Sequence, residues 1–129
     1  DARPGLGSMR AAVARIPPTL PQGTTTGILE HAVLPVKPGC EAEFEVAFRE
    51  AKPLIAGRPG FRHLTLSRSV ETPNTYLLLV WWDTVEDHTE GFRQSPEYQR
   101  WRALLHHFYD PYPDVEHFAT ITLADPPTV

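Results

Sequence analysis

The chain has 129 residues, of which 41% are hydrophobic and 22% charged, which is enough apolar material for the core of one ordinary domain. Its 12 Lys and Arg against 16 Asp and Glu give a formal net charge of -4, so no basic field attracts nucleic-acid phosphates. The longest apolar run, residues 76–82, is far shorter than the roughly 20 residues of a membrane-spanning helix. One cysteine excludes an internal disulfide, and no secretion signal opens the sequence, so we expect a cytoplasmic protein without nucleic-acid or membrane partners.

Residues 1–26 are rich in Pro and Gly and show no lasting apolar period. This composition predicts an extended amino-terminal arm rather than a core element. Met9 is preceded by eight residues, which are candidates for a vector or processing remnant. The folded domain is expected to span residues 27–125.

Four elements follow the arm. Residues 28–34 are rich in β-forming side chains and end at Pro35, which predicts a strand. Strands are also predicted at residues 61–70 and 76–82, separated by a turn. Between the first and second strands, apolar side chains recur at helical spacing and predict an amphipathic helix; they are Phe44, Ala47, Phe48, Ala51 and Ile55.

Two capped helices and a strand complete the predicted domain. The first helix begins with a capping-box pattern, which Thr84 with Asp87 or Asp83 with Glu86 can form. Ser95 is the expected cap of the second helix. With a final strand over residues 115–123, the order is βαββαβ. This is the α+β ferredoxin-like unit, an antiparallel sheet that carries its helices on one face.

The third predicted strand is apolar on both of its faces. Because successive side chains of a strand alternate between faces, one face takes the helices and the other needs a different cover. A second copy of the chain is the expected cover, so we predict a homodimer; cover by the amino-terminal arm is the alternative. One face carries Tyr76, Leu78, Val80 and Trp82, and the other carries Leu77, Leu79 and Trp81.

The chain resembles the antibiotic biosynthesis monooxygenase family over residues 27–123. The resemblance rests on VKPG at 36–39, GF at 60–61, YLLLVWWDT at 76–84, FRQSPEY at 92–98 and VEHF at 115–118. It implies a dimeric α+β barrel. It also implies oxidation of a small aromatic or polyketide-like substrate by dioxygen, with no metal, flavin or other cofactor, the substrate anion supplying the electrons. The alternative is a non-catalytic dimeric module that binds a hydrophobic ligand or acts as a scaffold.

Relatives that degrade haem have an Asn on the first strand and a Trp and a His near the last helix. The corresponding positions here hold His31, Phe92 and Arg102. The resemblance therefore does not extend to haem breakdown.

Three histidines are the candidate catalytic bases, and His31 is the leading one: its replacement by Ala is expected to lower kcat by about 100-fold or more. His31 shares a strand face with Leu29 and Val33, and if that face meets the helices, burial would keep its imidazole neutral and basic. A structural histidine bonded to the last strand is the alternative. The positive end of a helix dipole would lower the pKa of His88, unless that residue is simply solvated. His63, on the second strand, is open to both interpretations.

Aromatic side chains supply the expected walls of a substrate cavity, although an ordinary core would have the same spacing. His117 repeats the Glu-His pair of the first strand, so it could face His31 or lie at an interface. His106 and His107 are expected to cap the last helix as imidazolium groups. No ligand spacing typical of a metal site is present. The expected substrate-binding residues are Trp81, Trp82, Phe92, Tyr98, Trp101 and His117.

Overall fold

The computed structural model describes residues 27–124, so the predicted arm at 1–26 and the final residues 125–129 lie outside the described part. Residues 27–119 form one compact unit. Among the described residues, no helix is both long and apolar enough to cross a bilayer. The elements, in chain order, are β1 (Ile28–Pro35), α1 (Glu41–Ala56), β2 (Phe61–Arg68), β3 (Thr75–Trp82), η1 (Asp87–Phe92), α2 (Pro96–Leu105), η2 (His106–Phe108) and β4 (Val115–Ala119).

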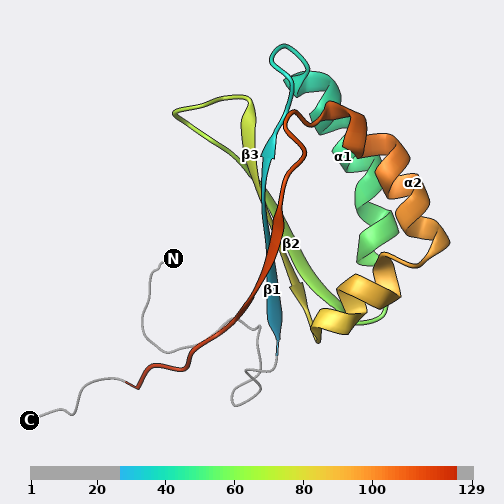
Figure 1. Cartoon of the computed structure of the whole chain (residues 1–129), viewed down its shortest axis with the longest axis vertical. Coiled ribbons are helices and arrows are strands. Elements are labelled where there is room, and N and C mark those ends of the chain that lie inside the picture. Colours follow the sequence, from blue (N-terminus) through green and yellow to red (C-terminus); the bar gives the residue numbers. More distant parts are fainter. Residues whose placement is uncertain (1–26, 125–129) are drawn as a thin grey trace, which may run out of the picture. The chain divides into compact units, whose positions relative to one another are not determined.

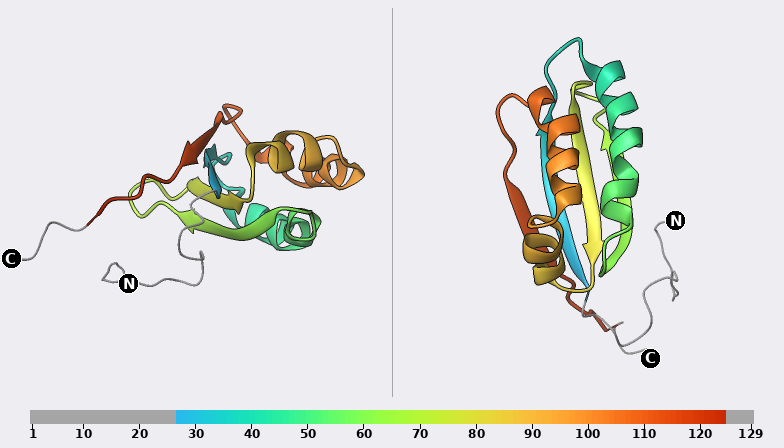
Figure 2. Two further views of the ribbon diagram at one scale, coloured as in Figure 1. Left: turned by 90° about the horizontal axis from the view of Figure 1, so that it is seen from below. Right: turned by 90° about the vertical axis from the view of Figure 1, so that its right-hand side faces the viewer.

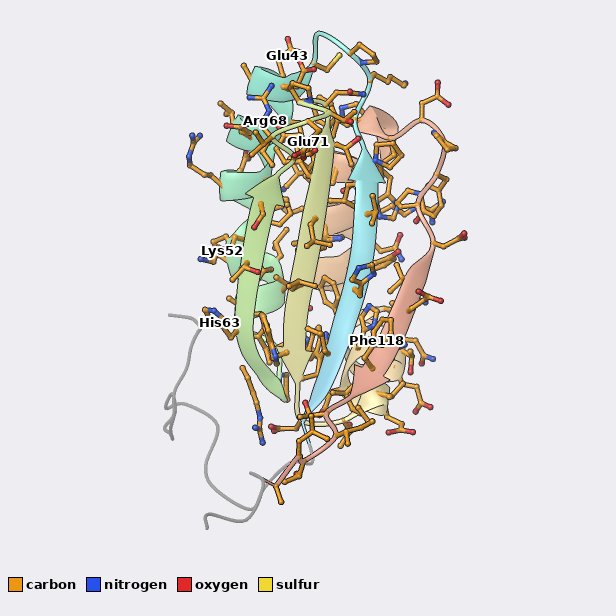
Figure 3. The ribbon with its side chains drawn as sticks, turned by 90° about the vertical axis from the view of Figure 1, so that its left-hand side faces the viewer. Glu43, Lys52, His63, Arg68, Glu71 and Phe118 are labelled. Carbon is orange, nitrogen blue, oxygen red and sulfur yellow. The ribbon has the colours of Figure 1, made fainter. Side chains whose placement is uncertain are left out.

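The strands form one antiparallel sheet in the order β2-β3-β1-β4. Helices α1 and α2 lie side by side on one face of this sheet and leave the other face open (Figure 1; Figure 2, right). The predicted α+β ferredoxin-like fold is therefore confirmed. The open face is the one toward the viewer in Figure 3, where His63 and Phe118 are labelled.

Strand alternation decides what each face carries. On β1, Glu30, Ala32 and Leu34 are buried toward the helices, whereas the side chains between them are partly or largely exposed. On β3 every second side chain from Tyr76 to Trp82 is buried in the same layer. The helical side of the core is supplied by Phe44, Phe48, Ala51, Ile55, Trp101 and Leu105.

The first of the two predicted capped helices is an unusual one. Its capping box is formed by Thr84 and Asp87: each backbone N–H donates to the other side chain, at 3.2 and 3.1 Å. η1 is a π-helix, in which the Arg93 N–H donates to the His88 carbonyl at 3.0 Å. Such wide turns occur often at functional sites. Here the turn buries both His88 and Phe92 against the sheet.

A close contact ties the beginning of β2 to this helix. Gly60 has φ +84, and a Cβ at this position would overlap the carboxylate of Asp87. Only glycine allows both the left-handed backbone and the approach of the capping carboxylate. The second capped helix also begins as predicted, because Ser95 Oγ accepts from the Tyr98 N–H at 3.2 Å.

Two predicted strands are too long. β2 ends at Arg68 rather than residue 70, because the chain turns directly after it: the Thr72 N–H donates to Ser69 Oγ, and the Thr75 N–H donates to the Thr72 carbonyl. β4 ends at Ala119 rather than residue 123. Its partner strand begins at Ile28, which pairs with Ala119, so β1 offers no further residues for pairing.

Candidate active site

A cavity of about 50 Å³ lies between the helix-bearing face of the sheet, η1, α2 and the chain that leads into β4. Its walls are mainly aromatic and aliphatic, and a few polar groups converge on it. The aromatic walls are Phe92, Tyr98, Trp101, Tyr109 and Tyr112, and the polar groups include Glu30, His88, Arg93 and His106.

Glu30 is the buried carboxyl group of this cavity. It is 5% exposed, and the indole N–H of Trp82 donates to its Oε1 at 2.9 Å. Burial raises the pKa of Glu30 to about 7, although the Trp82 hydrogen bond and the positive charge of Arg93 act in the opposite direction. The carboxyl group is therefore divided between its acid and base forms near neutral pH.

His88 covers Glu30 from η1. Its imidazole is 3% exposed and stacks on Trp82, with ring centroids 5.5 Å apart. Its Nε2 lies 3.4 Å from Glu30 Oε1. Burial lowers the pKa of His88 to about 3, and Arg93 and His117 add to the effect. His88 is neutral at pH 7, so its contact with Glu30 joins a carboxyl group to a neutral imidazole rather than forming an ion pair.

His117 is the next group along this row. It pairs with Glu30 across the β1-β4 ladder, so both side chains point to the helix-bearing face. Its Nε2 lies 2.8 Å from His88 Nδ1. Burial lowers the pKa of His117, with a further contribution from Arg93. His88 thus has the Glu30 carboxyl on one ring nitrogen and the His117 imidazole on the other.

His106 and Tyr112 form another part of the cavity wall. Tyr112 is 62% exposed, and its hydroxyl oxygen lies 3.2 Å from His106 Nδ1. Burial lowers the pKa of His106 to about 4, and Arg102 and Arg93 contribute in the same direction. The expectation of an imidazolium cap at His106 is therefore wrong, because at pH 7 the ring is neutral.

The structure brings four of the nine predicted site residues to the cavity: His88, Phe92, Tyr98 and Trp101. Trp82 lies beside them and holds Glu30 through its indole N–H. His117 does not line the cavity but contacts the Nδ1 atom of His88.

The other three predicted site residues lie on the open face. His31 packs against Phe118, with ring centroids 5.5 Å apart, and His63 packs against Trp81 at 5.2 Å. The prediction for His31 as base depended on a cavity on its own face, and the cavity lies on the other. His31 pairs with Glu116, so it does not face His117.

Sequence reasoning missed the polar and aromatic residues that complete the site. Strand alternation correctly places Glu30 on the face opposite His31, but that face was not expected to carry the cavity. Arg93, in the π-helical turn, and Tyr109 and Tyr112, in the segment before β4, have no regular periodicity that would have marked them. Within residues 27–124, no group of three or more His, Cys, Asp and Glu is arranged to hold a metal ion.

Comparison with known proteins places the chain in a family. Residues 27–104 match the family model described as antibiotic biosynthesis monooxygenase. YczJ, an uncharacterized protein of Bacillus subtilis (strain 168), is 55% identical over 94 residues, which cover 73% of this chain and 99% of YczJ. A crystal structure from Bordetella bronchiseptica that bears the same family's name is 38% identical, with a TM-score of 0.71 over 74% of this chain and 98% of that one.

A more distant similarity concerns the fold alone. A mutant form of SnoaB, a cofactor-independent oxygenase from Streptomyces nogalater, is 20% identical, with a TM-score of 0.67 over 76% of this chain and 96% of that one. The family model and the 55% identical relative together establish that this chain belongs to the antibiotic biosynthesis monooxygenase family.

Proposed function

We propose that this protein is a cofactor-independent monooxygenase that oxidises a small aromatic or polyketide-like molecule with dioxygen in the cytoplasm. The observation that carries the proposal is a buried, ionisable carboxyl group, Glu30, at an aromatic-lined cavity. Family membership supports the reaction class, and SnoaB is an oxygenase of that class with the same fold.

Glu30 is the base in this reaction. Its carboxylate takes the acidic proton of the substrate, and the C–H electrons stay on the substrate as a delocalised anion. The anion reduces dioxygen and forms a C–O bond to it, which gives a hydroperoxide after protonation. Loss of water converts the hydroperoxide to a carbonyl, so a methylene group and O₂ become C=O and H₂O.

The surroundings of Glu30 suit this task. A base works best when its pKa is near the working pH, and burial brings the pKa of Glu30 to about 7. Trp82 donates to the carboxylate form and fixes its orientation. Arg93, whose side chain reaches the cavity, supplies positive charge toward the anion that forms on the substrate.

The size of the cavity sets a condition on the substrate. A volume of about 50 Å³ holds dioxygen or a few water molecules, whereas sites for drug-sized molecules commonly have about 300–1,000 Å³. An aromatic substrate must therefore displace side chains at the rim, where Tyr112 is mostly exposed. The same observation favours the second candidate function, a dimeric module that binds a smaller hydrophobic ligand without turnover.

Oxygen uptake with a panel of anthrone-type and quinol-type compounds tests the reaction. We expect at least one anthrone-type compound to consume one O₂ per carbonyl formed, in the presence of a chelator and without added flavin or haem. Heat-denatured protein gives the background autoxidation of each compound. Uptake at the background rate with every compound would reject the oxygenase and favour the binding module.

The open face of the sheet is the proposed dimer interface. Val33 is 46% and Phe118 47% exposed on this face, together with half-buried apolar side chains on β1 and β3. Monomeric proteins rarely leave such a continuous apolar surface in water. A second copy of the same sheet covers it, as strand β3 predicts. The half-buried side chains are Leu29, Leu77, Leu79 and Trp81.

Light scattering at micromolar concentration checks this interface. We expect twice the chain mass of 14.5 kDa for the natural sequence and a monomer for Leu79→Lys, because a buried unpaired ammonium group opposes association. Val46→Lys is the matched control, since Val46 is 60% exposed on α1, away from the open face. A monomeric natural protein, or a dimeric Leu79→Lys, would contradict the proposed interface.

A further inference from the structure

A row of three titratable side chains leads from the cavity to the edge strand of the sheet. Glu30 Oε1 lies 3.4 Å from His88 Nε2, and His88 Nδ1 lies 2.8 Å from His117 Nε2. The fold creates the row, because cross-strand pairing places Glu30 beside His117 and η1 sets His88 over both. Glu30 and His88 are almost fully buried, whereas His117 is half-buried on β4, at the sheet edge.

We propose that Glu30 exchanges its proton with solvent through His88 and then His117, so that His117 serves the base as a proton-relay residue without touching the substrate. The catalytic use of this relay rests on the oxygenase function proposed above. The relay itself is a property of the unliganded protein.

The protons balance along this route. With Glu30 ionised, His88 carries its proton on Nε2, the ring nitrogen nearer the carboxylate, and accepts at Nδ1 from the Nε2–H of His117. The His88–His117 contact is a hydrogen bond, whereas the 3.4 Å contact between His88 and Glu30 must shorten to one when the proton moves. His117 takes up a solvent proton at Nδ1 and passes its Nε2 proton to His88 Nδ1. His88 in turn passes its Nε2 proton to Glu30. Both rings end neutral, in the opposite tautomers. The reverse sequence returns the proton of Glu30 to solvent.

The charges around the row favour this exchange between neutral rings. Arg93 acts on Glu30, His88 and His117, and its positive charge disfavours an imidazolium at either histidine. Trp82 donates to Glu30 but has no acceptor, so it cannot carry the proton. Burial raises the pKa of Tyr109, at the cavity wall, with a smaller contribution from the charge of Glu30, so its phenol stays protonated.

The relay lets Glu30 lose a proton while a substrate is bound. Over one turnover the peroxide anion takes up the proton that Glu30 removed, so no proton is released overall; the relay serves the fraction of Glu30 that is still protonated when the substrate binds. The pKa of Glu30 is about 7, and its own exposure to water, through the cavity, is only 5%. A bound aromatic substrate fills the cavity and removes that path for water. Through His117, the proton of Glu30 has a second path to solvent, on the side away from the substrate.

Nitrogen NMR of the histidine rings tests the relay without any substrate. In the natural protein we expect the protonated nitrogen of His88 and of His117 to exchange between Nδ1 and Nε2 over the same pH range in which the Glu30 carboxyl carbon titrates. In Glu30→Gln this exchange of tautomers disappears. Tautomers that stay fixed while Glu30 titrates would overturn the relay, whether or not a substrate is known.

Kinetics provide the second arm once oxygen uptake has identified a substrate. His117→Gln keeps a donor toward His88 but cannot pass a proton, so we expect kcat to fall about 10-fold with little change in KM. Added imidazole should restore kcat in proportion to its concentration. His107→Gln is the matched control, because His107 is exposed after α2 and does not line the cavity. Natural kcat in His117→Gln, or loss that imidazole does not restore, would count against the relay.

Discussion

Glu30→Gln is expected to lower kcat for oxygen uptake by about 100-fold or more, the usual scale for loss of a general base. Gln has nearly the shape of Glu and can still accept from the Trp82 N–H, which lies 2.9 Å from the carboxyl oxygen. It has no basicity, so it cannot take the substrate's proton. Because the change alters the chemical step more than the cavity, KM should stay close to its natural value.

His31→Ala provides the decisive comparison for this assignment. The sequence alone favoured His31 as base, with a similar loss of about 100-fold expected on its removal. Its position on the open face instead predicts natural kcat, as long as the protein remains dimeric. Full activity in Glu30→Gln together with inactivity in His31→Ala would reverse the assignment and return the chemistry to the open face.

The fold could be predicted from the sequence because its signals are local. Alternation on β3, helical spacing on α1, the Thr84–Asp87 box and the Ser95 cap each depend on residues a few positions apart. The ends of the strands could not be predicted from the sequence, because they depend on where the partner strand begins. β4 stops at Ala119 since β1 has no residue before Ile28 to pair with it.

There is a different reason why the sequence could not predict which face of the sheet carries the site. Along β1, Leu29 and Val33 on one face are as apolar as Ala32 and Leu34 on the other, so alternation separates the faces without ranking them. Association of two sheets would bury both faces, so the outer face would lack the polar side chains that usually identify a solvent-exposed face. His31 was consequently chosen over its neighbour Glu30.

For His88 the predicted direction of the pKa shift is correct, but its cause is different. The helix dipole was expected to keep its imidazole neutral, and the pKa is indeed lowered, but burial is the largest cause. The π-helical turn produces that burial, and no local sequence signal distinguished this turn from an ordinary helix. Arg93 comes to the cavity through the same turn, which explains why it was missed.

The stability of Glu30→Gln relative to the natural protein should rise with pH. Burial raises the pKa of Glu30 from 4.5 to about 7, so the native state binds the proton more tightly than the unfolded state. The stability that this provides is present below pH 4.5 and is lost as pH rises to about 7. At about 1.4 kcal/mol per pH unit, the loss is on the order of 3 kcal/mol.

His88 acts in the opposite direction. Its pKa is lowered from 6.5 to about 3, so its unfolded form binds the proton more tightly and stability is lost as pH falls below 6.5. Between pH 4.5 and 6.5 the slopes from Glu30 and His88 largely cancel in the natural protein, and His106, whose pKa burial lowers to about 4, adds a further rise in stability with pH. Glu30→Gln removes the one slope that falls with pH, so its free energy of unfolding should climb more steeply over this range than that of the natural protein.

Urea unfolding at fixed protein concentration, at intervals from pH 4.5 to 8, measures the difference between the two proteins. Because both contain His88 and His106, the difference isolates Glu30, and it should change by about 3 kcal/mol in favour of Gln as pH rises. Glu71→Gln is the matched control, since Glu71 is exposed in the loop between β2 and β3, and its difference from the natural protein should stay small throughout. A constant difference for Glu30→Gln would mean that Glu30 titrates in the native state as it does in the unfolded chain, and it could then not serve as a base tuned by burial.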